Sequence, residues 1–441
     1  MDWIQDIICH ILENYHGRRI VLWGKFDISD KIKEKLQNEY HINNVCYIDS
    51  NEMLVDNREV FSTDLVIKGK KTNYIVIPLA VHNSIKEILS REGYEAGLDF
   101  YYFSDCAIRV SEDYYEDAHG NKFFGRRDGI RFCFSGWNST IVIGKNAIID
   151  KNMPLYMHNG EFFELGEDSD ISKCTVVFEE KARIRIGNNV VLRNFNIKVK
   201  YGAELIVRDN VITKTYADSY QRILVEQYGF FELGENSDIS NCKICFKEKA
   251  KVHIGNNVIL RNCNLDVRQG AELIILDNVY AETYANTYQR VLVRQYGKVV
   301  IGKGTSIGHS FIILCPQNTE IVIGNECLIS WNLSVLSNDG HTIFDVNSRK
   351  AVNIPQEGQE RKVEVGDHVW IGANCIVLYG TYIGEGSIVG AGSLVKGNYP
   401  NNCILAGNVA KVIKKDMAWC MDDGEEDISA CGNFVNFTEE I

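Results

Sequence analysis

A chain of 441 residues is long enough for two domains, or for one repetitive rod with an additional domain. Its formal net charge of −12 argues against general binding to nucleic acids or to anionic membranes. The sequence has no run of about 18 apolar residues, and its first residues lack the basic start and apolar core of a signal peptide, so no transmembrane segment and no leader are predicted.

The first 105 residues alternate between helical and strand-like patterns, with strand-like runs at 20–24, 45–49 and 74–78. This alternation predicts a small α/β domain of Rossmann type over residues 1–105. The turn at 24–29 keeps a single glycine of the G-x-G-x-x-G motif, which argues against a dinucleotide site. A regulatory, docking or sugar-carrier-binding role stays open for this domain.

The middle of the chain is repetitive. Residues 162–229 and 230–297 are two copies of one unit of 68 residues. Residues 106–136 are predicted to be a connecting segment, and residues 137–300 to form the looser coils of a β-helix. An Asn-Asn pair recurs at the same place in both copies, which predicts ladders of stacked turn residues. The whole β-helix is expected to have on the order of 12 to 15 coils.

The cysteines do not form a pattern typical of a metal or redox site. Cys242 and Cys245 are the one close pair, and the matching place in the earlier copy keeps only Cys174. All 14 cysteines are therefore interpreted as reduced thiols of a cytoplasmic protein, and no metal is predicted.

Aliphatic residues fall at every sixth position from Val365 to Val395. A period of six fits neither a helix nor a simple strand, and is the hexapeptide repeat of a parallel β-helix. Residues 301–414 are assigned to this hexapeptide region, which a loop at 338–362 interrupts. Residues 415–441 form an acidic tail, for which a short helix followed by poorly ordered residues is predicted.

Hexapeptide coils often form acyl-CoA-dependent acyltransferases, which need a general base, a donor for the developing oxyanion and a slot for the CoA arm. His341 is the candidate base, because it lies where the repeat breaks, in a polar loop beside Asp339. An unperturbed imidazole titrates near pH 6.5, roughly what a base needs at neutral pH. His253, His309 and His368 occupy coil positions and are interpreted as face, turn or wall residues.

Residues 301–414 resemble the hexapeptide-repeat O-acetyltransferases that modify sugars and bacterial polysaccharides, among them the maltose, galactoside and capsule acetyltransferases. The resemblance implies a mainly β protein built on a left-handed parallel β-helix, with the N-terminal Rossmann-like domain as an addition. The strings that carry it are SNDGHTIFD (337–345), VGDHVWIGANCIVLYGTYIG (365–384), VGAGSLV (389–395) and AGNVAKVIKK (406–415).

The same resemblance implies roles for individual residues. His341 takes the general-base role, with Asp345 or Asp339 orienting its imidazole. Trp370 forms a wall of the acceptor or pantetheine slot. Small residues let backbone amides reach the pantetheine arm of CoA: Ala373, Ala391, Gly392 and Ser393.

The phosphates of CoA are assigned by resemblance to Lys411, acting as a point charge, with Lys396 as a second candidate. The G-N-P-A-K turn of the family reads Gly407-Asn408-Val409-Ala410-Lys411 here, so the turn is less rigid without its proline. The resemblance further implies acetyl-CoA as the co-substrate, no metal, and a homotrimer with CoA slots between neighbouring rods.

The sequence thus favours an acetyl-CoA-dependent O-acetyltransferase that acts on a sugar hydroxyl of a capsule or surface polysaccharide, or of its precursor. The alternative is an N-acyltransferase that acts on an amino sugar carried by a nucleotide, with the N-terminal domain holding the nucleotide. A third hypothesis is a scaffold without enzymatic activity, whose coils serve assembly alone.

Overall fold

The computed structural model divides the chain into two compact units, Met1–Ile143 with Lys151–Glu161, and Gly144–Asp150 with Phe162–Ile441. The residues that it describes are 3–24, 27–49, 60–62, 72–77, 85, 88–89, 91–95, 98–102, 107–111, 113–117, 120–127, 130, 132–134, 137–150, 155–213, 221–239, 242–281, 289–353, 362–422, 424 and 426–440.

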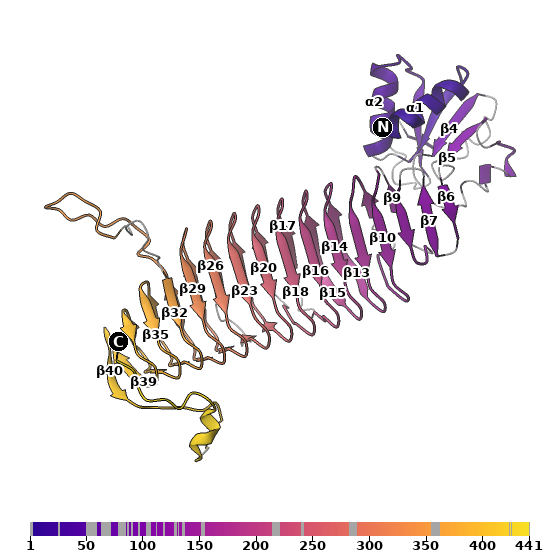
Figure 1. Cartoon of the computed structure of the whole chain (residues 1–441). Coiled ribbons are helices and arrows are strands. Elements are labelled where there is room, and N and C mark those ends of the chain that lie inside the picture. Colours follow the sequence, from indigo (N-terminus) through magenta and orange to yellow (C-terminus); the bar gives the residue numbers. More distant parts are fainter. Residues whose placement is uncertain are drawn as a thin grey trace. The chain divides into compact units, whose positions relative to one another are not determined.

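The first unit contains a parallel five-stranded sheet and two helices, α1 (Trp3–Asn14) and α2 (Asp27–Asn38) (Figure 1). Side chains alternate across each strand, so one face of the sheet buries Ile20 and Leu22 against the apolar sides of both helices. The other face packs Val21 against a second cluster that includes Leu89. In spatial order the strands are β3 (Val60–Ser62), β2 (Val45–Asp49), β1 (Arg19–Trp23), β4 (Asn73–Ile77) and β5 (Phe100–Tyr102).

The rest of this unit is β-structure with an aromatic interior. Tyr115 and Phe123 are fully buried, and the Phe123 and Phe132 ring centroids lie 4.6 Å apart. β6 pairs with β7 and β7 with β8 in antiparallel fashion, whereas β8–β10 and β9–β11 are parallel pairs. These strands are β6 (Ala107–Val110), β7 (Tyr114–Asp117), β8 (Lys122–Phe124), β9 (Phe132–Phe134), β10 (Thr140–Ile143) and β11 (Leu155–Met157).

Most of the described strands outside the five-stranded sheet form a parallel β-solenoid of about 13 turns, as the repeats predicted. In the second unit it has three parallel sheets, numbered here in the order in which a coil visits them (Figure 1). Sheet 1 comprises β12 (Phe162–Leu165), β14 (Arg183–Ile186), β16 (Glu204–Val207), β18 (Phe230–Leu233), β20 (Lys251–Ile254), β23 (Glu272–Ile275), β26 (Lys298–Ile301), β29 (Glu320–Ile323), β32 (Lys362–Val365), β35 (Thr381–Ile383) and β38 (Asn398–Tyr399).

Sheet 2 has short strands and ends in an antiparallel pair. It comprises β21 (Ile259–Leu260), β24 (Tyr280–Ala281), β27 (Ser306–Ile307), β30 (Leu328–Ile329), β33 (Trp370–Ile371), β36 (Ile388–Val389), β39 (Cys403–Gly407) and β40 (Ala410–Lys415). Sheet 3 comprises β13 (Asp170–Phe178), β15 (Val191–Val199), β17 (Gln221–Val225), β19 (Lys243–Phe246), β22 (Cys263–Val267), β25 (Gln289–Val293), β28 (Phe311–Cys315), β31 (Leu333–Leu336), β34 (Ile376–Leu378) and β37 (Leu394–Val395).

The six-residue period marks the inward positions of the last coils. Its aliphatic side chains are at most 1% exposed, and burial of each stabilises the coil by about 1.5 to 3 kcal/mol. They come in turn from sheets 1, 2 and 3, so the period of six is one third of a coil of 18 residues. The set is Val365, Ile371, Val377, Ile383, Val389 and Val395.

The predicted asparagine ladders are present at the turns. The Asn236 side-chain amide donates to Asn257 over 3.2 Å, and that of Asn257 donates to Asn278 over 3.0 Å. All three residues have positive φ, a conformation that asparagine tolerates better than most residues. The ladder therefore satisfies polar groups and fixes a left-handed turn at the same place in successive coils.

The acidic tail differs from its prediction. A short 3-10 helix is present at Ile428–Cys431, but the residues around it pack back on the last coils. The rings of Trp419 and Phe434 stack on His368 with centroids 4.2 and 4.4 Å away. The Asn402 side-chain amide donates to the carbonyl oxygen of Phe434. Aromatic residues that the charge pattern obscured therefore anchor the tail.

None of the helices in the described part of the chain has the length and apolar character needed to span a bilayer.

Candidate active site

Two corners of the solenoid carry the residues singled out in the sequence. The sheet 2–3 corner, where a coil passes from sheet 2 into sheet 3, holds the WIGAN and GAGS strings at 370–374 and 390–393. The sheet 3–1 corner, where a coil returns to sheet 1, holds the loop that begins after β31 and bears His341. Of that loop, residues 354–361 lie outside the described part of the chain.

The WIGAN and GAGS turns lie on adjacent coils. β33 pairs with β36, and the Gly392 N–H donates to the carbonyl oxygen of Ala373 over 2.8 Å. Gly392 has a φ of +73°, which favours glycine, and both it and Ala391 are exposed. Ala373 is half-buried. The corner thus presents backbone with little side chain over it, as a slot for an extended amide-bearing ligand requires.

Ser393 has a different place from its neighbours. Its side chain is 2% exposed, and its hydroxyl donates to the Gly390 carbonyl oxygen over 2.6 Å. The Ser393 hydroxyl oxygen in turn accepts the Gly407 N–H over 3.2 Å. Ser393 therefore ties the GAGS turn to the turn between β39 and β40, and its hydroxyl is engaged within the fold.

The two lysines assigned to CoA are at different corners. Lys411 is exposed on β40, which pairs with β39, so it shares the hairpin whose turn contacts GAGS. Lys396 follows β37 at the sheet 3–1 corner, and its ammonium lies 4.5 Å from the centroid of the Tyr379 ring. Among the described residues the structure thus brings Lys411, but not Lys396, to the side of the GAGS turn.

Trp370 is an outward-facing residue of β33. Its side chain is 39% exposed, and it pairs with Leu328 on one side and Ile388 on the other. The Trp419 ring of the tail lies 6.0 Å from it. The indole is therefore an accessible apolar wall on sheet 2, next to the corner that carries WIGAN.

His341 is exposed in the loop after β31. Asn353 holds the loop around it: its amide nitrogen donates to the His341 carbonyl oxygen over 2.7 Å, and its amide oxygen accepts the Ile343 N–H over 2.7 Å. The same nitrogen donates to the Asp339 carboxylate over 2.9 Å. Nothing in the sequence pattern indicated Asn353, because its role depends on a contact across twelve residues of loop.

The two candidate orienting carboxylates have other partners. Asp345 accepts the Ser348 N–H over 2.6 Å, and this hydrogen bond lowers the pKa of the Asp345 carboxyl. Asp339 accepts from Asn353. Among the described residues no hydrogen bond joins either carboxylate to the His341 ring, so the orienting role of Asp345 or Asp339 stays a prediction.

A cavity of about 370 Å³ lies beside His341. One end is polar, formed by the loop residues from Asn338 to His341, and Arg294 also lines the cavity. The rest of the wall is largely apolar and comes from successive strands of sheet 3, through Leu292, Leu314 and Leu336. The candidate base therefore borders a pocket that could hold an acceptor.

The three histidines at coil positions have structural partners. His368 is 6% exposed and lies in the aromatic stack with the tail, and the His309 ring stacks on Trp331 at 5.9 Å. His253 is paired with Glu232 over 3.0 Å on sheet 1. Their interpretation as wall, turn and face residues is confirmed. In the described part of the chain no group of three His, Cys, Asp or Glu residues could hold a metal ion.

The fold and the strings at these corners define the class: a parallel β-solenoid of the hexapeptide-repeat transferases. Residues 362–397 match the family described as bacterial transferase hexapeptide (six repeats). A polysialic acid O-acetyltransferase of Escherichia coli O1:K1 is 30% identical over 139 residues, which are 32% of this chain and 43% of the relative.

A putative acetyltransferase of Schizosaccharomyces pombe is 30% identical over 151 residues, 34% of this chain and 69% of the relative. The crystal structure of the polysialic-acid-specific acetyltransferase NeuO is similar at 28% identity and a TM-score of 0.36, covering 46% of this chain and 83% of that chain. The chain belongs to the hexapeptide-repeat acetyltransferase family. It spans less than half of the first of these relatives.

Proposed function

We propose that this chain is an acetyl-CoA-dependent O-acetyltransferase that acts on a sugar hydroxyl of a capsule or surface polysaccharide, or of its precursor. The observation that carries the proposal is the exposed imidazole of His341 beside a cavity, with the WIGAN and GAGS turns one and two coils further along the solenoid. Similarity to relatives named as O-acetyltransferases of polysaccharides supports it.

In the proposed reaction the His341 imidazole takes the proton of the sugar hydroxyl as its oxygen attacks the thioester carbonyl. The tetrahedral intermediate then collapses, the carbon–sulfur bond breaks, and the imidazolium returns the proton to the leaving thiolate. An ester and free CoA are formed, and the histidine is again neutral. No metal takes part in this proton transfer.

The binding of CoA is assigned to the sheet 2–3 corner. The exposed backbone at Ala391 and Gly392 supports contacts to the pantetheine arm, with Ala373 one coil away. The position of Lys411 in the β39–β40 hairpin supports its assignment to the phosphates of CoA. Ser393 is assigned a positioning role in this slot, because its hydroxyl holds the GAGS turn.

We propose a homotrimer, which the resemblance to the family implies and which the separation of the two corners supports. His341 and the GAGS turn lie at opposite ends of sheet 3 strands, and a four-residue strand such as β31 spans about 13 Å. A neighbouring copy could bring its sheet 2–3 corner against the sheet 3–1 corner of this one. Each active site would then combine the base of one chain with the CoA slot of another.

The handedness of the solenoid, the type of the N-terminal domain and the cellular location are also proposals. We assign a left-handed coil to the solenoid from its hexapeptide repeats. The strand order β3-β2-β1-β4-β5 in a parallel sheet supports a Rossmann-like domain in the first unit. The twelve cysteines whose side chains the structure describes are free thiols, which supports a reducing cytoplasm as the location.

The test is a screen of acceptors with acetyl-CoA, read by mass spectrometry of the products. We expect transfer of an acetyl group to a glycan hydroxyl, giving an ester that mild alkali removes. An alkali-stable amide on a nucleotide-linked amino sugar would instead establish the N-acyltransferase alternative. If the chain neither bound nor hydrolysed acetyl-CoA, the scaffold hypothesis would remain.

A further inference from the structure

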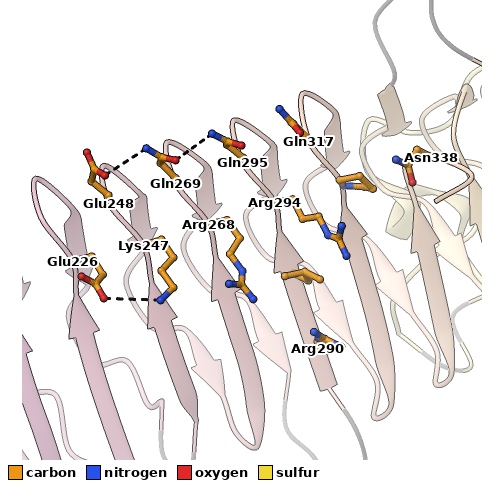
Figure 2. Close-up of a pocket in the computed structure, with 12 residues that line it drawn as sticks. Glu226, Lys247, Glu248, Arg268, Gln269, Arg290, Arg294, Gln295, Gln317 and Asn338 are labelled. Atoms are coloured by element: carbon orange, nitrogen blue, oxygen red, sulfur yellow. Dashed lines mark hydrogen bonds and ion pairs between the residues drawn. The ribbon is translucent and has the colours of Figure 1, made fainter. Parts of the chain in front are cut away.

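A groove of about 920 Å³ runs along the outer face of sheet 3, wholly within the second unit (Figure 2). Its lining begins at Glu226, directly after β17, and reaches Asn338, two residues after β31. It crosses six consecutive strands of the sheet. At about 4.8 Å for each of five steps, its length is roughly 24 Å. A groove of this length suits several linked units better than one small molecule.

The groove is basic although the chain is acidic. Its lining contains four cations, Lys247, Arg268, Arg290 and Arg294, against the two carboxylates of Glu226 and Glu248. The local net charge is therefore +2, in a chain whose formal net charge is −12. A concave surface of one sign raises the local concentration of ligands of the opposite sign.

The four cations differ in their partners. Lys247 lies 4.0 Å from Glu226, and Arg268 is 2.7 Å from Asp266, so both are at least partly neutralised within the protein. Arg290 and Arg294 make no ion pair with a carboxylate of the described residues. The Nε atom of Arg290 is buried without a hydrogen-bond partner in that part of the chain. A buried charged donor without an acceptor is costly unless a ligand supplies one.

Arg290 and Arg294 are on the same face of the sheet. Arg290 is the second residue of β25, Leu292 the fourth, and Arg294 follows the last residue of the strand, so this spacing of two puts all three side chains on the outer face. The two arginines are separated by about 13 Å along the strand direction. Leu292 lies between the two cations and pairs with Leu314, which pairs with Leu336, so an apolar floor leads from the groove into the cavity beside His341.

The groove leads to the candidate base. Leu292, Arg294 and Asn338 line both the groove and the cavity that contains His341. At the rim of the groove a row of neutral amides follows the same direction, with the Gln295 side chain donating to that of Gln269 over 3.2 Å (Figure 2). Amides suit the hydroxyl groups of sugars, because they both donate and accept.

We propose that this groove binds an anionic polysaccharide, a glycan with carboxylate or phosphate groups along its chain, and delivers one of its hydroxyls to His341. This inference rests on the proposed O-acetyltransferase function and specifies its acceptor. Arg290 and Arg294 pair with anionic groups of the glycan, and the leucine floor contacts the apolar faces of its sugar rings. None of the residues lining the groove is aromatic, which disfavours single-stranded nucleic acid, whose bases stack on aromatic side chains.

The test compares the binding of a fluorescent polyuronate oligomer with that of a neutral malto-oligosaccharide of equal length, by anisotropy at low salt. We expect the wild-type chain to bind the polyuronate at least about tenfold more tightly, because each charge-assisted hydrogen bond stabilises the complex. Added salt should weaken this binding, since the groove is open to solvent. Equal binding of the two probes, or tighter binding of a single-stranded oligonucleotide, would overturn the assignment.

Substitutions of single arginines test whether the polyuronate binds in the groove. Arg294→Gln removes an exposed guanidinium and should weaken polyuronate binding about tenfold, and Arg290→Gln should act in the same direction. Arg185→Gln removes the same charge from an exposed position on sheet 1 and should bind as the wild type does. Melting temperatures verify that each variant is folded. Unchanged polyuronate affinity in both groove variants would contradict the proposal.

Acetyl transfer to a small neutral sugar, measured in parallel on the wild-type chain, reports on the proposed function alone. Polyuronate binding that depends on the arginines but is accompanied by no acetyl transfer to any acceptor would overturn the enzymatic function and leave the groove as a glycan site. Acetyl transfer without any preference for the anionic polymer would support the proposed enzymatic function and contradict the groove as a site for an anionic glycan.

Discussion

The two parts of the solenoid in the second unit both have a buried apolar interior, but they differ at their corners. In the looser coils Lys251 pairs with Glu272, 21 residues on, whereas in the hexapeptide coils Val363 pairs with Thr381, 18 residues on. The extra residues lengthen the turns and carry long polar side chains along the sheet 3–1 corner. The shorter coils instead leave almost bare backbone at the sheet 2–3 corner.

This difference suggests that the two parts of the solenoid bind different substrates. On the proposals above, long turns on sheet 3 supply charged and amide side chains for an extended acceptor. Short turns supply backbone for the uniform amide arm of CoA. A solenoid can vary its corners in this way because each coil contacts only its neighbours. Measurements on single residues can test whether both parts have an interior closed to water and whether their differences lie at the corners.

The largest expected effect concerns buried thiols. Burial raises the pKa of Cys174 in the looser coils and of Cys327 nearer the hexapeptide coils to about 12 in each case. A raised pKa means less thiolate at a given pH, by about a thousandfold for a shift of three pH units near neutrality. We therefore expect both thiols to resist alkylation at pH 8 in the folded chain, and to react after denaturation.

Mass spectrometry of iodoacetamide-treated protein measures this resistance, with the exposed Cys9 as the internal reference. Rapid native labelling of Cys174 but not of Cys327 would show that the looser coils are open to water. That result would contradict the statement that both parts of the solenoid have a buried apolar interior.

The next effect concerns the close stacking of the hexapeptide coils. A Cβ added at Gly366 would lie 2.7 Å from the backbone nitrogen of Glu385, in the adjacent coil. Backbone cannot move aside cheaply, so Gly366→Ala should lower the free energy of unfolding by about 2 to 3 kcal/mol. Chemical denaturation followed by circular dichroism measures the change.

Gly380→Ala is the matched control. Gly380 has a φ of +71° but no atom within 4 Å of an added Cβ, so this variant should lose only about 1 kcal/mol. Equal losses at both positions would mean that backbone conformation, rather than the approach of adjacent coils, decides the cost.

The smallest expected effect concerns the asparagine ladder of the looser coils. Asn257→Ala removes two side-chain hydrogen bonds and places alanine at a φ of +55°, so it should cost about 1 to 2 kcal/mol of unfolding free energy. Asn257→Gly loses the same bonds but relieves the backbone. It should therefore be the more stable of the two variants, as measured by denaturant titration.

Much of the second unit was predictable from the sequence, because coils repeat locally. The period from Val365 to Val395 and the recurring asparagines report inward and turn positions that each depend on adjacent coils alone. The contacts that were missed join residues without such a period. Trp419 reaches His368 across 51 residues, and Asn353 holds the His341 loop through its side chain.

The candidate site was predictable in part for the same reason. The strings reveal which residues share a corner, since their spacing equals the coil length. They do not reveal that Asp345 is hydrogen-bonded to Ser348, or that Lys396 lies over the Tyr379 ring. These depend on the path of a loop and on a side-chain rotamer, which no repeat constrains.

The proposed function depends most on the role of His341, at the sheet 3–1 corner, as the general base. The most direct measurement is kcat for acetyl transfer by His341→Ala, with acetyl-CoA binding measured on the same preparation. If His341 is the general base, the variant should lose at least about a hundredfold in kcat and keep its affinity for acetyl-CoA. His253→Ala, on sheet 1 and paired with Glu232, should keep the wild-type rate. Undiminished turnover in His341→Ala would contradict the account.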